Sequence, residues 1–74
     1  MMQNALYIEK NRNIDIGVNM SEYKGHELLN IRECWVGRDG ERTPTRKGIT
    51  IPKRCALEFY EALTKVLIDE EIIS

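Results

Sequence analysis

The sequence predicts an α+β fold in which four short strands precede one C-terminal helix. Polar and apolar residues alternate between residues 14 and 20, the period of a strand with one buried face. Glycine-containing turns separate the strand-like segments that follow, and beyond Pro52 the apolar residues take up helical spacing. A chain of 74 residues has room for one domain, which we expect to occupy residues 1–74.

The small size of the chain limits how much core it can build. A domain this short buries only roughly 60% of the surface of its unfolded form and commonly depends on disulfides, a metal or a partner chain. Two cysteines, Cys34 and Cys55, are too few for a disulfide scaffold, and one histidine argues against a metal site. We expect both cysteines to be small buried hydrophobes, no metal or cofactor, and oligomerisation to complete the core.

The first half of the predicted sheet contains a short strand at residues 5–9, a polar turn at residues 10–13 and the alternating strand at residues 14–20. Gly17 stands at an outward-facing position of the alternating strand. Glycine at such a position predicts a bulge or a strong bend.

The second half of the sheet begins after a turn at residues 23–26, where Gly25 can adopt a positive φ. A strand at residues 27–36 and a turn at residues 37–40 follow. Because Pro44 cannot donate a backbone hydrogen bond, we expect residues 41–45 to form a loop or an edge. Residues 46–51 are the fourth predicted strand.

The C-terminal segment has the apolar spacing of an amphipathic helix. Pro52 ends the last strand and suits the first turn of a helix, where its missing N–H costs nothing. The apolar stripe contains Ala56, Phe59, Tyr60, Leu63, Val66 and Leu67. Acidic residues 69–71 are poorly placed at the negative end of the helix dipole, so the helix should end there.

Charge is unevenly distributed along the chain, although the net charge is only −1. Residues 1–54 hold ten Lys and Arg against seven Asp and Glu, whereas residues 55–74 hold one Lys against five acids. The positive charge is therefore concentrated on the predicted sheet. Residues 22–51 also mix these cations with aromatic residues, a combination that holds single-stranded nucleic acid through base stacking and phosphate contacts.

The region from about Val18 to Ile51 contains a distinctive set of elements: Ser21-Glu22-Tyr23-Lys24-Gly25, Leu28-Leu29-Asn30-Ile31-Arg32-Glu33, Trp35, Asp39-Gly40-Glu41 and Pro44-Thr45-Arg46-Lys47-Gly48-Ile49-Thr50-Ile51. With these elements the chain resembles the C-terminal domain of the transcriptional positive cofactor 4 family. The resemblance implies a homodimer in which each protomer has a strongly curved four-stranded antiparallel sheet followed by a helix. It further implies sequence-independent binding of single-stranded DNA or melted duplex in transcription regulation, replication or repair, without catalysis.

The resemblance also supplies candidate nucleic-acid-binding residues. Aromatic and basic positions of the family fall on Tyr23, Lys24, His26, Arg32, Trp35, Arg46 and Lys47. Ser21 and His26 stand where some members carry Arg or Lys, so at most a partial positive charge is expected there near pH 7. The helix lacks a family tryptophan near Ala56. No long acidic, serine-rich segment is present, which favours a compact prokaryotic or viral member over a nuclear coactivator.

Several alternatives remain open at the level of sequence. A lone tryptophan in a small domain is more often core or interface than a binding residue. Strict alternation places Arg32 and Trp35 on opposite faces, so one groove could use both only if the strand bulges, twists sharply or the site wraps an edge. An alternative function is a protein-interaction adaptor that dimerises through its helix and docks on RNA polymerase or on replication or repair proteins.

The expected location is intracellular, because free cysteines suit a reducing compartment and no segment has the pattern of a signal peptide or membrane span. A prokaryotic chain would be cytoplasmic, a viral one would lie in the host-cell interior, and a eukaryotic one would be nuclear. We expect no membrane partner.

Overall fold

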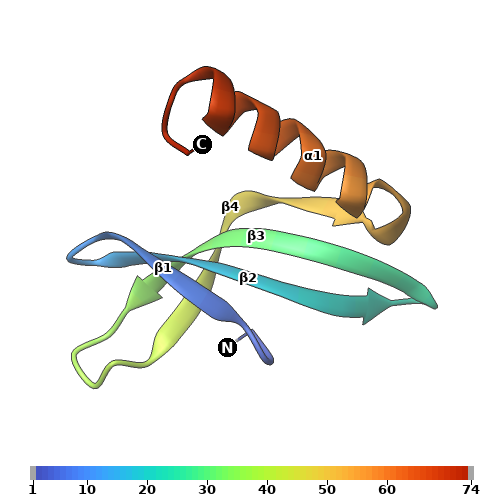
Figure 1. Cartoon of the computed structure of the whole chain (residues 1–74). Coiled ribbons are helices and arrows are strands. Elements are labelled where there is room, and N and C mark those ends of the chain that lie inside the picture. The colour runs from blue at the N-terminus through green and yellow to red at the C-terminus, as the bar shows by residue number, and fades with distance from the viewer. Residues whose placement is uncertain (1, 74) are drawn as a thin grey trace.

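A computed structural model describes residues 2–73 of the chain. Figure 1 shows one antiparallel sheet with strand order β1-β2-β3-β4 and a single helix after the last strand. The elements are β1 (Leu6–Asn11), β2 (Ile14–Tyr23), β3 (His26–Val36), β4 (Arg42–Pro52) and α1 (Lys53–Asp69). The predicted α+β order of four strands and one helix is confirmed.

Strand boundaries differ from the sequence-based prediction mainly in β4. This strand begins at Arg42 and passes through Pro44, so residues 42–45 are strand and not loop. β4 is the outer strand of the sheet, which confirms the edge alternative, because a proline is tolerated where one side of the strand lacks a neighbour. Pro52 is the N-cap and α1 starts one residue later, at Lys53.

The connection between β2 and β3 is a two-residue hairpin turn. Tyr23 pairs with His26, and both intervening residues have positive φ, 51° at Lys24 and 81° at Gly25. Two consecutive left-handed residues are the mark of a turn whose twist matches that of antiparallel strands. The predicted turn and its use of Gly25 are therefore confirmed, with His26 already part of β3.

Gly17 does not produce the predicted bulge. The register between β2 and β3 runs without interruption from Ile14 opposite Trp35 to Tyr23 opposite His26. A Cβ on Gly17 would lie 2.7 Å from Met2 Sδ and 3.0 Å from the Tyr7 ring. Side chains therefore pack directly onto the backbone of Gly17, and the bulge alternative of the prediction was wrong.

The continuous register separates the sheet into two chemically different faces. One face is mostly apolar and presents, in phase with one another, Leu6, Ile8, Ile14, Ile16, Val18, Met20, Leu29, Ile31, Ile49 and Ile51. The other face is mostly polar and includes Asp15, Asn19, Asn30 and Arg32. α1 lies over β3 and β4 (Figure 1). Its first residue, Lys53, forms a 2.7 Å ion pair with Glu27, which is on the apolar face of β3.

Little of the described chain is buried. Cys34, with no exposed surface, is the only buried hydrophobic residue among residues 2–73, and α1 has no buried residue. Beside Cys34, the carboxylate of its cross-strand neighbour Asp15 accepts a 2.7 Å hydrogen bond from Arg42 Nε. The Arg42 guanidinium also lies 4.1 Å from the Tyr7 ring centroid. Cys55 is half-buried, so the prediction of a buried hydrophobe is confirmed for Cys34 alone.

No helix among residues 2–73 has both the length and the apolar character needed to cross a bilayer.

Replacing Gly48 by alanine should destabilise the fold strongly. The new Cβ would lie 2.4 Å from Ile31 O and 2.8 Å from Arg32 Cα, and neither backbone atom can move without disturbing β3. We expect the free energy of unfolding to fall by about 3 kcal/mol, at the upper end of the range for overpacking. Chemical denaturation at fixed protein concentration measures it.

Gly40→Ala is the matched control, because Gly40 has a φ of 82° but no other residue within 4 Å of the place that a Cβ would take. Its free energy of unfolding should fall only by the cost of holding alanine in a left-handed conformation, about 1 kcal/mol. Equal losses in the two variants would contradict a close approach of β4 to β3 at Gly48.

Candidate nucleic-acid interface

The site is organised by an irregularity in the pairing of β3 with β4. Arg32 pairs with Gly48 and Cys34 pairs with Pro44, so Thr45, Arg46 and Lys47 together lie opposite Glu33. β4 thus carries two more residues than β3 at this point. An insertion of this kind bends the strand and redirects its side chains.

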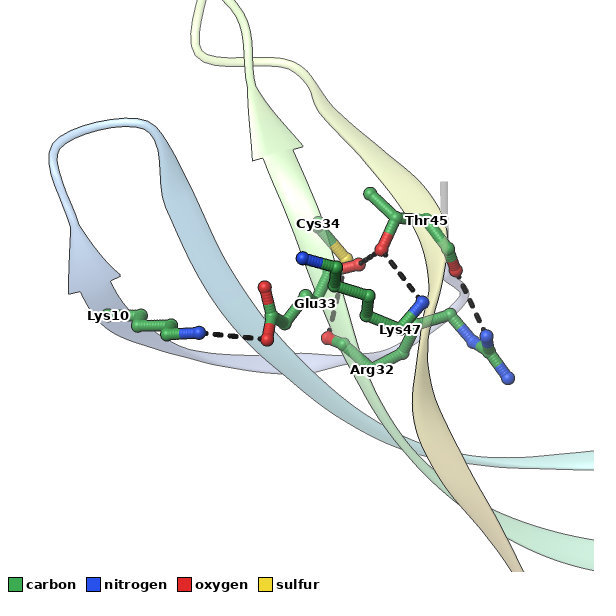
Figure 2. A network of polar contacts seen from close by, with 6 residues as sticks. All are labelled: Lys10, Arg32, Glu33, Cys34, Thr45 and Lys47. Carbon is green, nitrogen blue, oxygen red and sulfur yellow. Dashed lines mark hydrogen bonds and ion pairs between the residues drawn. The ribbon is translucent and has the colours of Figure 1, made fainter.

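Thr45 fixes the shape of this insertion (Figure 2). Its hydroxyl donates to Glu33 O at 2.9 Å and accepts from Lys47 N at 3.1 Å. Its carbonyl oxygen accepts a 3.0 Å bond from Arg32 Nη1. One residue therefore satisfies groups from both strands where the regular ladder is interrupted.

The insertion brings three of the predicted site residues together. Trp35, Arg46 and Lys47 line one hollow on the surface, with Ile14, Glu33 and Thr45 completing its wall. The Trp35 residue is 56% exposed, so its ring is not a core side chain of the protomer. An open aromatic surface flanked by two cations has the components needed to stack a base and meet a phosphate.

Arg32 does not join this hollow. Because β3 keeps an unbroken register with β2, Arg32 shares the polar face with Asn30, whereas Trp35 is in phase with Glu33. β3 has no bulge that would bring Arg32 and Trp35 to the same face. The irregularity is in β4, and it leaves these two residues on opposite faces. The Arg32 guanidinium instead bonds to Thr45 O in the insertion (Figure 2).

The remaining predicted residues gather at the β2–β3 hairpin. Tyr23 is 62% exposed, and the Lys24 ammonium lies 5.3 Å from its ring centroid. His26 begins β3 at the same tip. Arg32 lies six positions after His26 on the same strand, a separation of about 20 Å. The candidate residues thus lie at two separate places on the sheet. We call Tyr23, Lys24 and His26 the hairpin cluster, and Trp35 with Arg46 and Lys47 of the insertion the β4 cluster.

A polar stretch connects the hairpin to Arg32 on the same face. Asn30 Nδ2 donates to Asn19 Oδ1 at 3.0 Å and to Ser21 Oγ at 2.8 Å. These side chains keep further lone pairs for a ligand, since amide and hydroxyl oxygens can each accept more than one bond. Sequence reasoning treated Ser21 only as a missing cation and did not single out the two asparagines.

Two cations near His26 were also missed. Lys53 and Arg54 line a second hollow together with Gly25, His26, Glu27, Leu28 and Pro52. In the sequence, the one indication of their role was that they come directly after Pro52, at the end of the last predicted strand. Only the pairing of Leu28 with Pro52 shows that they lie beside the hairpin.

Lys10 is the third missed cation, and it binds Glu33. Its ammonium donates a 2.9 Å bond to Glu33 Oε2 across the intervening strand β2. This hydrogen bond, with the positive charges of Lys10 and Lys47, holds the pKa of Glu33 below its ordinary value. The ionised carboxylate stabilises the fold above the ordinary carboxyl pKa, and this contribution is lost as the pH falls through the lowered pKa.

The described chain offers no arrangement for holding a metal. Among residues 2–73, no group of three or more His, Cys, Asp or Glu side chains comes together. The interface is therefore described by rings, cations and polar side chains alone.

Thr45→Val should loosen the β4 insertion while keeping the side-chain shape. It leaves Glu33 O and Lys47 N without their hydroxyl partner, at a cost of about 1–3 kcal/mol. The control is Thr43→Val, since the Thr43 hydroxyl makes no hydrogen bond to any part of the chain that the structure describes. Thermal denaturation of both variants measures the difference, and equal melting temperatures would contradict an organising role for Thr45.

Comparison with known proteins agrees with this geometry. Residues 8–65 match the family model described as Transcriptional Coactivator p15 (PC4). A crystal structure of a PC4 homologue from Burkholderia pseudomallei is similar at a TM-score of 0.75 and 26% identity, covering 82% of each chain. A second crystal form of it has a TM-score of 0.68, covering 85% of this chain and 97% of the other.

A bacteriophage T5 homologue of the eukaryotic coactivator PC4, implicated in recombination-dependent DNA replication, shares the fold at a TM-score of 0.74. It is 20% identical, with 93% of this chain and 81% of the other covered. The bacterial and phage sources agree with the expected prokaryotic or viral type. Because the family model covers most of the sequence, the chain belongs to the Transcriptional Coactivator p15 (PC4) family.

Proposed function

We propose that the protein binds single-stranded DNA or melted duplex as a homodimer, without requiring a defined sequence and without catalysis. The observation that carries this proposal is the exposed Trp35 ring in one hollow with Arg46 and Lys47. DNA-directed work in transcription, replication or repair follows from family membership, and the phage relative implicated in DNA replication supports it.

The β4 cluster supplies the two kinds of contact that a single strand offers. Stacking of a base on an aromatic ring contributes roughly 1–3 kcal/mol and tolerates every base, because each has a π face. Arg46 and Lys47 neutralise phosphates, which releases counterions and makes the affinity fall with salt. Neither contact reads a sequence, so we expect broad specificity.

The hairpin cluster extends the path of the strand. Tyr23 offers a second exposed ring, with Lys24, His26 and Arg32 along the same side of β2 and β3. The distance of about 20 Å between the hairpin and Arg32 would be spanned by several nucleotides. Asn30 and Ser21 lie between them and offer polar contacts.

The proposal of a homodimer is supported by the apolar surface that a protomer leaves exposed. Leu57 and Tyr60 of α1 are 66% and 63% exposed, and Ile8 and Ile49 on the apolar sheet face are 60% and 51% exposed. A 74-residue chain with one buried hydrophobic residue in its described part has too little core of its own. A second copy that covers α1 and the part of the apolar face away from the Trp35 hollow would supply the missing burial.

DNA binding is tested by titrating a fluorescently labelled, mixed-sequence single-stranded oligonucleotide at several salt concentrations. Trp35→Ala should weaken binding by roughly fivefold or more, and Trp35→Phe, which keeps a ring, should retain most of the affinity. The double variant Arg46→Gln/Lys47→Gln should lower the salt slope by about 1.4, or about 0.7 for each phosphate that is no longer neutralised.

Lys65→Gln is the control for charge, because Lys65 lies on α1 and pairs with Asp69. Its salt slope should equal that of the wild type. No binding at low salt would reject the proposal and favour an adaptor that docks on RNA polymerase or on repair proteins. Unchanged affinity in Trp35→Ala would remove the β4 cluster from the site.

Dimerisation is tested separately by light scattering of Leu57→Asp. Leu57 is largely exposed in the protomer, so a charge there costs little within one chain but should disrupt a helix-mediated dimer. We expect a dimer for the wild type and a monomer for the variant at micromolar concentration. Glu58→Gln, a neighbouring change on the polar side of α1, should remain dimeric, and a monomeric wild type would refute the proposal.

A further inference from the structure

Glu33 is an unexpected lining residue for a hollow that binds a polyanion. Its carboxylate lies on the same face as Trp35, two positions along β3 and therefore about 7 Å away along the strand. Both side chains line the hollow that also contains Arg46 and Lys47. A carboxylate at this place repels a phosphate group that enters the hollow.

The rest of the lining favours a flat apolar ligand part. The exposed wall of the hollow is almost wholly apolar, with Ile14 packed as the cross-strand partner of Trp35. Arg46 and Lys47 belong to the wall on the β4 side. The hollow therefore suits a nucleobase, with the phosphates outside it and near the two cations.

The carboxylate has acceptor capacity that the protein does not use. Lys10 binds Oε2, and no hydrogen bond reaches Oε1 from any of residues 2–73. The cations around Glu33 keep it ionised, and an ionised carboxylate can only accept hydrogen bonds. A ligand that shields Oε1 from water must therefore offer it a donor or leave that oxygen without a partner.

We propose that the hollow prefers nucleobases that carry an exocyclic amino group, with Glu33 as the acceptor of their N–H bonds. Cytosine and adenine offer an amino group, and guanine offers an amino group beside a ring N–H. Uracil and thymine carry a carbonyl oxygen in place of the amino group, so their one ring N–H lies between two carbonyl oxygens that the carboxylate repels. The inference rests on the proposed single-strand binding and adds a base preference to it.

The experiment compares the affinities of oligo-dC and oligo-dU of equal length at one salt concentration and neutral pH. The two strands have the same backbone and ring size, and they differ at the edge where an amino group replaces a carbonyl oxygen. The wild type should bind oligo-dC on the order of fivefold tighter, the lower end of the discrimination expected from a carboxylate that reads a base edge.

Glu33→Gln should bring the ratio of the two affinities close to one, because an amide can donate to the carbonyl of uracil as well as accept from cytosine. Losing a negative charge raises the affinity for both strands and cancels in the ratio. Glu9→Gln is the matched control, since it removes the same charge from an exposed position of β1 outside this hollow, and it should keep the wild-type ratio.

The outcomes separate this inference from the proposed function. Binding of neither strand would overturn both. Binding of both strands with equal affinity by the wild type would leave the proposed function intact and overturn the base preference. A preference that survives in Glu33→Gln would overturn the role of Glu33, whatever the stability of that variant.

Discussion

The structure depends on one constraint in the pairing of β3 with β4, where three residues of β4 must fit opposite Glu33. β4 meets this constraint by a close approach at Gly48, where a side chain would overlap the backbone of β3. Thr45 bonds to Arg32 and Glu33 of β3 and to Lys47 of β4, so the extra residues have a defined shape. The cations of the insertion then lie beside Trp35, a position that regular pairing would not give them.

The same arrangement divides the candidate binding residues between the two faces of the sheet. An unbroken β3 keeps Arg32 on the polar face and Trp35 on the other, so the aromatic and basic residues cannot form one flat platform. A strand of nucleic acid that used both clusters would have to pass around the edge formed by β4. α1 and the part of the apolar face away from the Trp35 hollow remain available for a second copy, since the small core around Cys34 lies on the polar side.

The sequence was informative wherever a local pattern determined the structure. The alternation from Ile14, the hairpin turn at Gly25 and the helical spacing after Pro52 all predicted the elements that form. The β4 insertion was invisible because two extra residues leave the period of two in phase on either side of it. The role of Gly17 was misjudged because the side chains that pack on it, Met2 and Tyr7, come from a part of the chain distant in sequence.

The contact between Lys10 and Glu33 was equally beyond sequence reasoning, because it crosses β2 and joins residues 23 positions apart. Its chemistry bears on how a cationic surface becomes selective. Each added Lys or Arg strengthens binding to every strand alike, whereas discrimination requires a group that one ligand satisfies and another does not. A carboxylate held ionised by Lys10 beside Trp35 is such a group, because it weakens phosphate attraction locally and favours only a base that can donate to it.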